Sequence, residues 1–155
     1  MNASPAPGFS GATSPRPIGV GIHILQTDAN PPVGWHDAVA IACRAEELGF
    51  DSISMGDHLV MHFDDLKLGV WDAWTFLSGI AAMTSRIRLE TLVAATAYRN
   101  PALLAKIADS LDEVSGGRFT LGIGAGWHEP EFRSFGFPYD HRVSRFGEAS
   151  GIISS

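Results

Sequence analysis

The chain has 155 residues and a formal net charge of -6, so it lacks the basic surface that a nucleic-acid groove needs to neutralise phosphates. Hydrophobic residues make up 45% of the sequence, enough for one sizeable core, and no apolar run approaches the roughly 18 residues of a membrane span. The single cysteine, Cys43, excludes an internal disulfide and fits a cytoplasmic location.

Residues 1–17 are mostly Pro, Gly, Ser and Ala and carry one charge, on Arg16. They lack the apolar stretch of a signal peptide, and their prolines oppose helix formation. We therefore expect a disordered leader over residues 1–17 and a folded region over residues 18–155.

From residue 18 onward, strand and helix patterns alternate about every 34 residues, close to the size of one βαβ unit. The predicted strands begin at Ile18, Ser52, Ile87 and Phe119. Because no hairpin signal separates them, the pattern predicts an α/β fold with a parallel sheet and right-handed crossovers. A closed (β/α)8 barrel needs eight such units and about 250 residues, so we expect a partial TIM barrel of about four βα units.

The third predicted helix carries the strongest boundary signals. Asn100 can cap its first turn, Pro101 fits there because its missing N–H costs nothing, and Gly116 ends it. Its period predicts a buried stripe that includes Leu111 and Val114.

The remaining elements follow the same logic. Helices are predicted over residues 35–48, 71–83 and 142–153. The segment 59–70 is interpreted as a long loop, either a substrate lid or an ordinary covered loop.

The predicted helix over residues 71–83 is apolar on nearly all sides, with one charge at Asp72. A helix on the outside of a barrel should show a polar face. We therefore expect a homodimer through this helix, with burial by neighbouring helices of the same chain as the alternative.

Parallel β/α folds place their ligands at the carboxyl ends of the strands. This rule selects four segments, which are residues 23–26, 56–58, 92–96 and 124–128. We expect a small-molecule site where these segments meet.

Asp57 and His58 follow the second strand directly. An acid beside an imidazole can hold a fixed hydrogen bond and move a proton near neutral pH, although a capping Asp next to a loop His is the alternative. His62, Asp64 and Asp65 suggest a metal site, but the first strand offers one histidine, His23, and no paired His-x-His, so no metal is predicted.

Gly122, Gly124 and Gly126 surround the end of the fourth strand in the run LGIGAGW. Glycine there lets the backbone approach a flat or phosphorylated ligand, whereas a tight loop without a ligand is the alternative. The run is not the dinucleotide fingerprint, because Trp127 stands where the third glycine belongs. Trp127 and His128 are interpreted as candidates to stack on or hydrogen-bond a planar cofactor.

The stretch YRNPALLAKIADSLDEVSGGRFTLGIGAGWHEPEFRSFGFP, Tyr98 to Pro138, resembles the luciferase-like monooxygenase family, the bacterial luciferase superfamily of flavin and deazaflavin enzymes. The frame of R-N-P, L-A-K, L-D, S-G-G-R and L-G-x-G-x-G-W with a following E is specific when taken whole. The resemblance extends from about Ile18 to Ile153 and corresponds to the N-terminal half of a family member.

The Asp57-His58 pair looks like the Asp-His of the branch that uses coenzyme F420, an 8-hydroxy-5-deazaflavin, with FMN as the alternative cofactor. The resemblance implies that Asp57 positions the deazaflavin, that His58 is the acid or base near its ring, and that His23 is a weaker candidate. It places a non-proline cis peptide bond at Thr91–Leu92. The residues implied to line the cofactor cleft are Ala94, Ala125, Gly126 and Trp127, together with Thr91 and Leu92.

The implied activity is hydride transfer between the reduced cofactor and a small organic substrate. An FMN-dependent monooxygenase, which activates oxygen, and a catalytically inactive truncated barrel are the alternatives. Because the resemblance includes nothing of the second half of the barrel, we expect only part of an active site.

Overall fold

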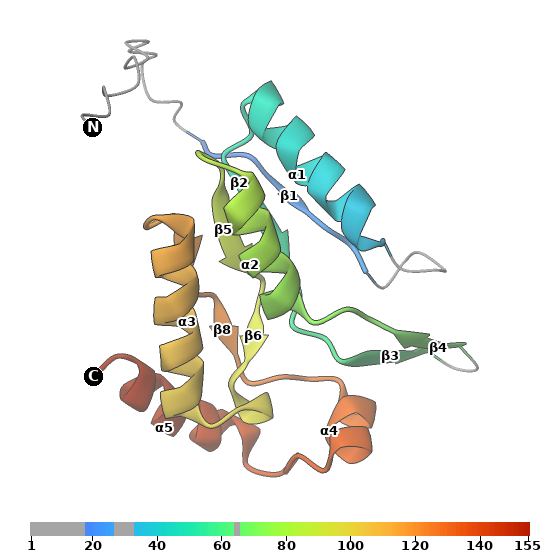
Figure 1. Cartoon of the computed structure of the whole chain (residues 1–155). Coiled ribbons are helices and arrows are strands. Elements are labelled where there is room, and N and C mark those ends of the chain that lie inside the picture. The colour runs from blue at the N-terminus through green and yellow to red at the C-terminus, as the bar shows by residue number, and fades with distance from the viewer. Residues whose placement is uncertain (1–17, 27–32, 64–65) are drawn as a thin grey trace.

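The computed structural model describes residues 18–26, 33–63 and 66–155, so the leader predicted over residues 1–17 lies outside the described residues. Figure 1 shows the order of the elements along the chain. The elements are β1 (Gly21–His23), α1 (Trp35–Leu48), β2 (Ser52–Met55), β3 (Val60–Phe63), β4 (Leu66–Gly69), α2 (Ala73–Met83), β5 (Arg88–Thr91), β6 (Ala94–Ala95), the 3-10 helix η1 (Thr96–Tyr98), α3 (Pro101–Ser115), β7 (Phe119–Thr120), β8 (Ile123–Gly124), α4 (Glu129–Phe135) and α5 (Arg142–Ile153).

The main sheet has four parallel strands in the order β1-β2-β5-β7, which confirms the predicted α/β fold of about four βα units. Each strand of this sheet lies beside the strand of the sheet that follows it in the chain, which is the common arrangement for successive strands. Within the described residues the sheet stays open and does not close into a barrel.

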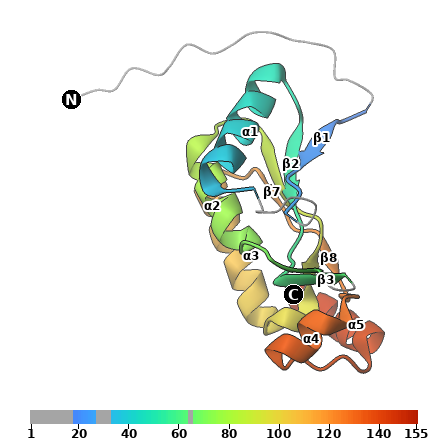
Figure 2. The ribbon, with the colours of Figure 1, turned by 90° about the vertical axis from the view of Figure 1, so that its right-hand side faces the viewer.

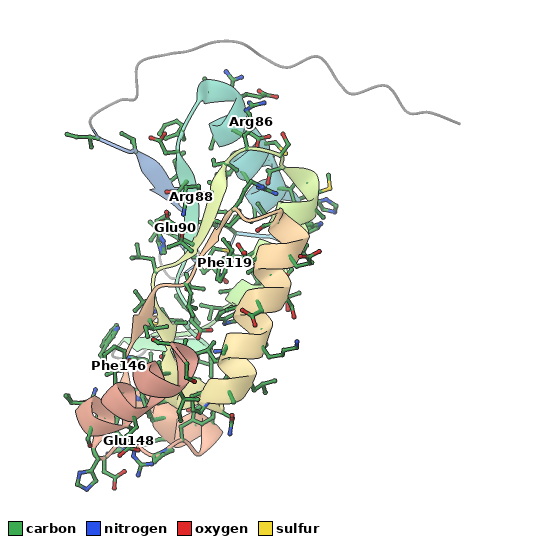
Figure 3. The ribbon with its side chains drawn as sticks, turned by 90° about the vertical axis from the view of Figure 1, so that its left-hand side faces the viewer. Arg86, Arg88, Glu90, Phe119, Phe146 and Glu148 are labelled. Atoms are coloured by element: carbon green, nitrogen blue, oxygen red, sulfur yellow. The ribbon has the colours of Figure 1, made fainter. Side chains whose placement is uncertain are left out.

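The register of the sheet separates an apolar face from a polar one. Since successive side chains of a strand point to opposite faces, each row of paired residues shares one face. The row that packs into the hydrophobic core is Ile22, Ile53, Leu89 and Phe119. The next row, on the other face, is His23, Ser54, Glu90 and Thr120. Figure 2 shows α1, α2 and α3 together on the apolar side, and Figure 3 shows Arg88 and Glu90 on the side away from α3.

Helix α2 begins two residues later than predicted, at Ala73, because the Asp72 side chain caps it by accepting from the Thr75 N–H at 2.7 Å. It packs between α1 and α3 of the same chain, which buries most of its apolar side chains. Trp71 and Met83 at its two ends remain about half exposed. The alternative of burial within the chain therefore accounts for much of this apolar helix, and the homodimer stays a prediction.

The boundaries of α1 and α3 match their predictions. Helix α3 starts at Pro101, the Asn100 Oδ1 accepts from two backbone N–H groups of its first turn, and Gly116 ends it in the left-handed conformation. The predicted burial of Val114 is wrong, since this side chain is 56% exposed while Leu111 is buried. No helix among the described residues combines the length and apolar character that a membrane crossing requires.

Arg118 joins the ends of α2 and α3 to the sheet. Its guanidinium donates to the carbonyl oxygens of Ala81, Thr84, Ile87 and Ser115 at 2.6 to 3.1 Å. The carboxyl end of a helix leaves several carbonyl groups without intrahelical partners, and one Arg can satisfy several of them. This side chain therefore fixes the sheet at the amino ends of its strands, opposite to the edge where the sequence predicts a small-molecule site.

The segment 59–70 is not the loop that was predicted. Strands β3 and β4 pair antiparallel within it, with Met61 opposite Leu68. Both of these side chains are buried, which explains why a short apolar stretch forms a hairpin. Figure 1 shows the hairpin projecting to the right after β2, with α4 below it, and β3 contacts α4.

Candidate active site

A cavity of about 320 Å3, here called the main cavity, opens at the carboxyl ends of the parallel strands. Three of the four predicted segments meet in it. Its lining residues are Asp57, His58, Leu92, Val93, Ala95, Tyr98, Gly124, Ala125, Gly126 and Trp127. The Asp-His pair and the glycine-rich bend therefore share one edge of the sheet, as the rule for parallel β/α folds requires.

The fully buried Glu131 of α4 holds the segment that follows β2. Its Oε2 lies 3.1 Å from His58 Nδ1 and accepts a hydrogen bond of 2.6 Å from the Tyr98 hydroxyl. Its Oε1 accepts from the backbone N–H groups of Leu59 at 2.5 Å and Val60 at 3.1 Å. An ionised carboxylate only accepts hydrogen bonds, so His58 carries a proton on Nδ1, and in the neutral form of the ring Nε2 is the acceptor.

The charge of this cluster is set by opposing effects. Burial raises the pKa of Glu131, but hydrogen bonds from His58, Tyr98 and Leu59 outweigh it and bring the pKa below its ordinary value. Burial, followed by the nearby Glu131, raises the pKa of Tyr98 well above its ordinary value. The cluster therefore holds one negative charge on Glu131 and keeps the Tyr98 hydroxyl as a proton donor.

The Asp57 carboxylate points into the protein and is fully engaged there. Arg99 donates to it in a bidentate pair, with Nη1–Oδ2 at 2.5 Å and Nη2–Oδ1 at 2.9 Å. The Trp74 indole and the Ala95 backbone N–H each donate to it at 3.2 Å. Burial raises the pKa of Asp57 and the Arg99 guanidinium opposes that rise. Asp57 thus ties β2, β6 and α2 together behind the main cavity.

The wall opposite His58 is a bulge between β5 and β6. A cis peptide bond joins Leu92 to Val93, one residue later than the predicted Thr91–Leu92 bond. Thr91 points away from the main cavity, where its hydroxyl exchanges hydrogen bonds with the backbone of Gly122 at 2.9 and 3.0 Å. Leu92 and Val93, which are 58% and 43% exposed, form the apolar surface that faces the opening.

The glycines of the LGIGAGW run permit the close approach of this bulge. A Cβ on Gly122 would lie 2.2 Å from the carbonyl oxygen of Thr91, and Gly126 has a φ of 76°. Only glycine tolerates both conditions without strain. The run therefore lets the segment after β7 lie against the bulge, and the main cavity lies along that contact.

Trp127 and His128 have different environments although they are adjacent. The Trp127 ring lines the main cavity and is 59% exposed, with its centroid 5.9 Å from that of His58. His128 is buried, and its Nε2 accepts from the His62 backbone N–H at 3.1 Å. Trp127 is available to a ligand, whereas His128 fixes the β3–β4 hairpin to α4.

His23 lies outside the main cavity. It borders a smaller cavity of about 100 Å3, here called the recess, whose lining includes His58 and Leu92 as well. Its Nδ1 lies 2.9 Å from the Ser54 hydroxyl, and burial, followed by the nearby His58, lowers its pKa. His23 is therefore neutral near pH 7 and adjoins the main cavity through the His58 ring.

The structure separates the predicted site residues into two groups. The residues that line the main cavity are Asp57, His58, Leu92, Ala125, Gly126 and Trp127, whereas Thr91 and Ala94 are buried behind its wall. Of the residues suggested for a metal, Asp64 and Asp65 lie outside the described residues. Among residues that the structure describes, no group of three or more His, Cys, Asp or Glu side chains is arranged to hold a metal ion.

The sequence analysis assigned no role to Glu131, Arg99 or Tyr98. All three lie within the stretch from residue 98 to 138 that carries the family resemblance. Their contacts join residues that are 73, 42 and 33 positions apart in the chain, so no local pattern could pair them. In the sequence, nothing distinguishes the buried Glu131 from the surface Glu129, which lies two residues earlier in the same short helix.

Comparisons with known proteins agree with this arrangement. A family model described as luciferase-like monooxygenase matches residues 18–155. The pyrimidine monooxygenase RutA of Agrobacterium fabrum is 37% identical over 124 residues, covering 74% of this chain and 33% of the relative. The chain therefore spans about a third of the length of this curated relative.

Solved structures resemble the chain over most of its length. Monooxygenase RslO1 from Streptomyces bottropensis has a TM-score of 0.75 at 28% identity, covering 88% of this chain and 42% of that one. An F420-dependent secondary alcohol dehydrogenase in complex with an F420-acetone adduct has a TM-score of 0.69 at 26% identity. The match covers 88% of this chain and 40% of the dehydrogenase. The oxygenating constituent of 3,6-diketocamphane monooxygenase from Pseudomonas putida, in complex with FMN, shares the fold at 19% identity with a TM-score of 0.74, covering 87% and 38%.

Proposed function

Because the chain belongs to the luciferase-like monooxygenase family, we propose that its main cavity holds the ring of a flavin or deazaflavin cofactor for oxidation or reduction of a small organic substrate. The observation that carries this proposal is the meeting of His58 with the Leu92–Val93 bulge and the Gly124–Trp127 segment around one opening.

The residues present fit such a ring. Leu92, Val93 and Trp127 offer exposed apolar surface to a planar group, and the glycines beside them leave room for it. The lining contains His58 as a group that can exchange a proton, with Tyr98 beside it. Such a cofactor would supply hydride or oxygen chemistry, while the protein orients it and excludes water.

His58 is proposed as the acid or base of the reaction. Glu131 holds the Nδ1 proton, which leaves Nε2 to accept a proton from a reacting group and return it. Asp57 is proposed to have a structural role, holding the segment after β2 in place. Both oxygens of its carboxylate accept hydrogen bonds from Arg99, Trp74 and the Ala95 N–H, which leaves neither for a cofactor. His23 is proposed to contact the substrate side of His58.

The choice of cofactor remains part of the proposal. The Asp57-His58 pair supports coenzyme F420, with FMN as the alternative, and the likeness to both an F420-dependent enzyme and an FMN-bound enzyme favours neither. A cytoplasmic location and a small-molecule substrate are proposed on the same basis.

Fluorescence titration of the full chain tests the proposal. We expect quenching of either F420 or FMN at micromolar concentration, weakened by about tenfold in Trp127→Ala. Trp71→Ala is the matched control, since Trp71 is 48% exposed but lies outside the main cavity, and its affinity should equal that of the wild type. A folded chain that binds neither cofactor would support the alternative of a catalytically inactive partial barrel.

A further inference from the structure

The side chain of Gln26, at the carboxyl end of β1, contains a buried donor without a partner. Its Oε1 accepts from the Trp71 backbone N–H at 2.6 Å, which fixes the orientation of the amide because an N–H cannot accept from the NH2 group. Its Nε2 is the one buried side-chain nitrogen or oxygen, among the described residues, that has no hydrogen-bond partner. Such groups are rare in folded proteins and call for an explanation.

Gln26 lines the recess, which adjoins the main cavity. The recess has a volume of about 100 Å3 and is lined by His23, Ile24, Gln26, Gly56, His58 and Leu92. His58 and Leu92 line the main cavity as well. A ligand that lies against His58 in the main cavity can therefore extend one small group into the recess.

The lining of the recess indicates the chemistry of that group. Among the described residues, its lining includes no Lys, Arg, Asp or Glu, so these residues offer no fixed charge to an ionic ligand. Since Ser54 engages the Nδ1 of His23, the Nε2 of that ring can donate a proton when the Ser54 hydroxyl donates to Nδ1. The unpartnered Gln26 NH2 group, with His23 beside it, therefore suits an uncharged hydrogen-bond acceptor.

We propose that the recess binds a carbonyl oxygen of the substrate, with the Gln26 Nε2–H as its donor and His23 beside it. This inference rests on the proposed function, because it names the class of substrate, a neutral ketone or cyclic amide, that the same site takes. The carbonyl group enters the recess and the carbon skeleton lies toward the main cavity, next to His58.

The substitution Gln26→Glu separates this role from a structural one. Glutamate keeps an oxygen for the Trp71 N–H and replaces only the NH2 donor by an acceptor. We expect wild type to bind cyclohexanone at least about tenfold more tightly than cyclohexylammonium, and Gln26→Glu to reverse that preference. Equal preference of both proteins for the two probes would overturn the proposal.

A second measurement needs no variant. In the wild-type chain, cyclohexanone should shift the side-chain NH2 resonances of Gln26, and cyclohexylammonium should leave them in place. Resonances of Gln26 that ignore cyclohexanone would contradict the proposal even if a flavin or deazaflavin binds. Conversely, a shift of these resonances in a chain that binds no cofactor would support the recess and count against the proposed cofactor site.

Discussion

The Nδ1 atom of His58 lies 3.1 Å from the Oε2 atom of Glu131, which comes 73 residues later in the chain. Glu131 is fully buried, so its negative charge is balanced only by the groups that donate to it. The same carboxylate accepts from the Tyr98 hydroxyl and from the backbone after β2. One buried residue therefore sets both the position and the tautomer of the proposed acid or base.

The first prediction concerns that tautomer. In Glu131→Gln the side-chain NH2 group can donate to His58 Nδ1, so the neutral ring should move its proton to Nε2. Two-bond 1H–15N correlation spectra of the His58 ring distinguish the two forms. We expect the Nδ1–H form in wild type and the Nε2–H form in the variant. The same spectrum from both proteins would show that Glu131 does not select the tautomer.

The second prediction concerns stability in acid. The pKa of Glu131 is lower in the folded chain than the ordinary value of about 4.3, so its stabilising effect is complete above that value and is lost as the pH falls through the folded pKa. Urea unfolding at a series of pH values should show a decline below about pH 5 that Glu131→Gln reduces.

Glu129→Gln is the matched control for this measurement. Glu129 lies in the same helix and pairs with Arg133 on the surface, at 2.6 Å. Surface pairs contribute about 0 to 1 kcal/mol, so this variant should keep the wild-type dependence on pH. If the free energy of unfolding of Glu131→Gln fell with decreasing pH as steeply as that of the wild type, the acid sensitivity would belong to other groups.

The third prediction concerns the ion pair behind the main cavity. Arg99→Met leaves the buried Asp57 carboxylate without its bidentate partner, which should lower the free energy of unfolding by about 3 to 5 kcal/mol. Adding Asp57→Asn should recover part of that loss, because the uncompensated charge is then gone. Chemical unfolding of the wild type and these two variants measures both effects.

Arg145→Met provides the comparison for Arg99. Its guanidinium pairs with Asp140, and both side chains are about half exposed or more. The expected change is below about 1 kcal/mol. Similar losses for Arg99→Met and Arg145→Met would mean that the Asp57 pair carries no special stability.

The fourth prediction concerns the homodimer expected through the helix that begins near Trp71. Met83 is 58% exposed at the carboxyl end of α2, and Trp71, just before its amino end, is 48% exposed. Sedimentation at increasing concentration should show a dimer that Met83→Asp dissociates and Val143→Asp, on the exposed face of α5, does not. A monomer mass at every concentration would remove the dimer from this account.

Much of the fold follows from local sequence signals. Helices α1 and α5 match their predicted ranges, and the cap at Asn100 with the stop at Gly116 is confirmed because each depends on nearest neighbours alone. The parallel sheet follows from the period of strands and helices. These features required no knowledge of contacts between distant residues.

The features that the sequence analysis missed depend on distant contacts. The β3–β4 hairpin forms because Met61 and Leu68 are buried against the rest of the fold. The bulge at Leu92–Val93 lies against the segment after β7, where Gly122 leaves room for the Thr91 carbonyl group. The pairing of Asp57 with Arg99, 42 residues later in the chain, gives no local signal in the sequence. Local patterns thus located the edge of the sheet that holds the site but not the pairing of its charges.

The most direct test of the central proposal maps cofactor binding onto the backbone. In 1H–15N spectra of the full chain, FMN or F420 should shift the amide resonances of residues 92–95 and 124–127, while those of Arg142–Ile153 in α5 stay in place. That result would locate the cofactor in the main cavity beside His58. Shifts confined to other parts of the chain, or none with either cofactor in a folded protein, would contradict the account.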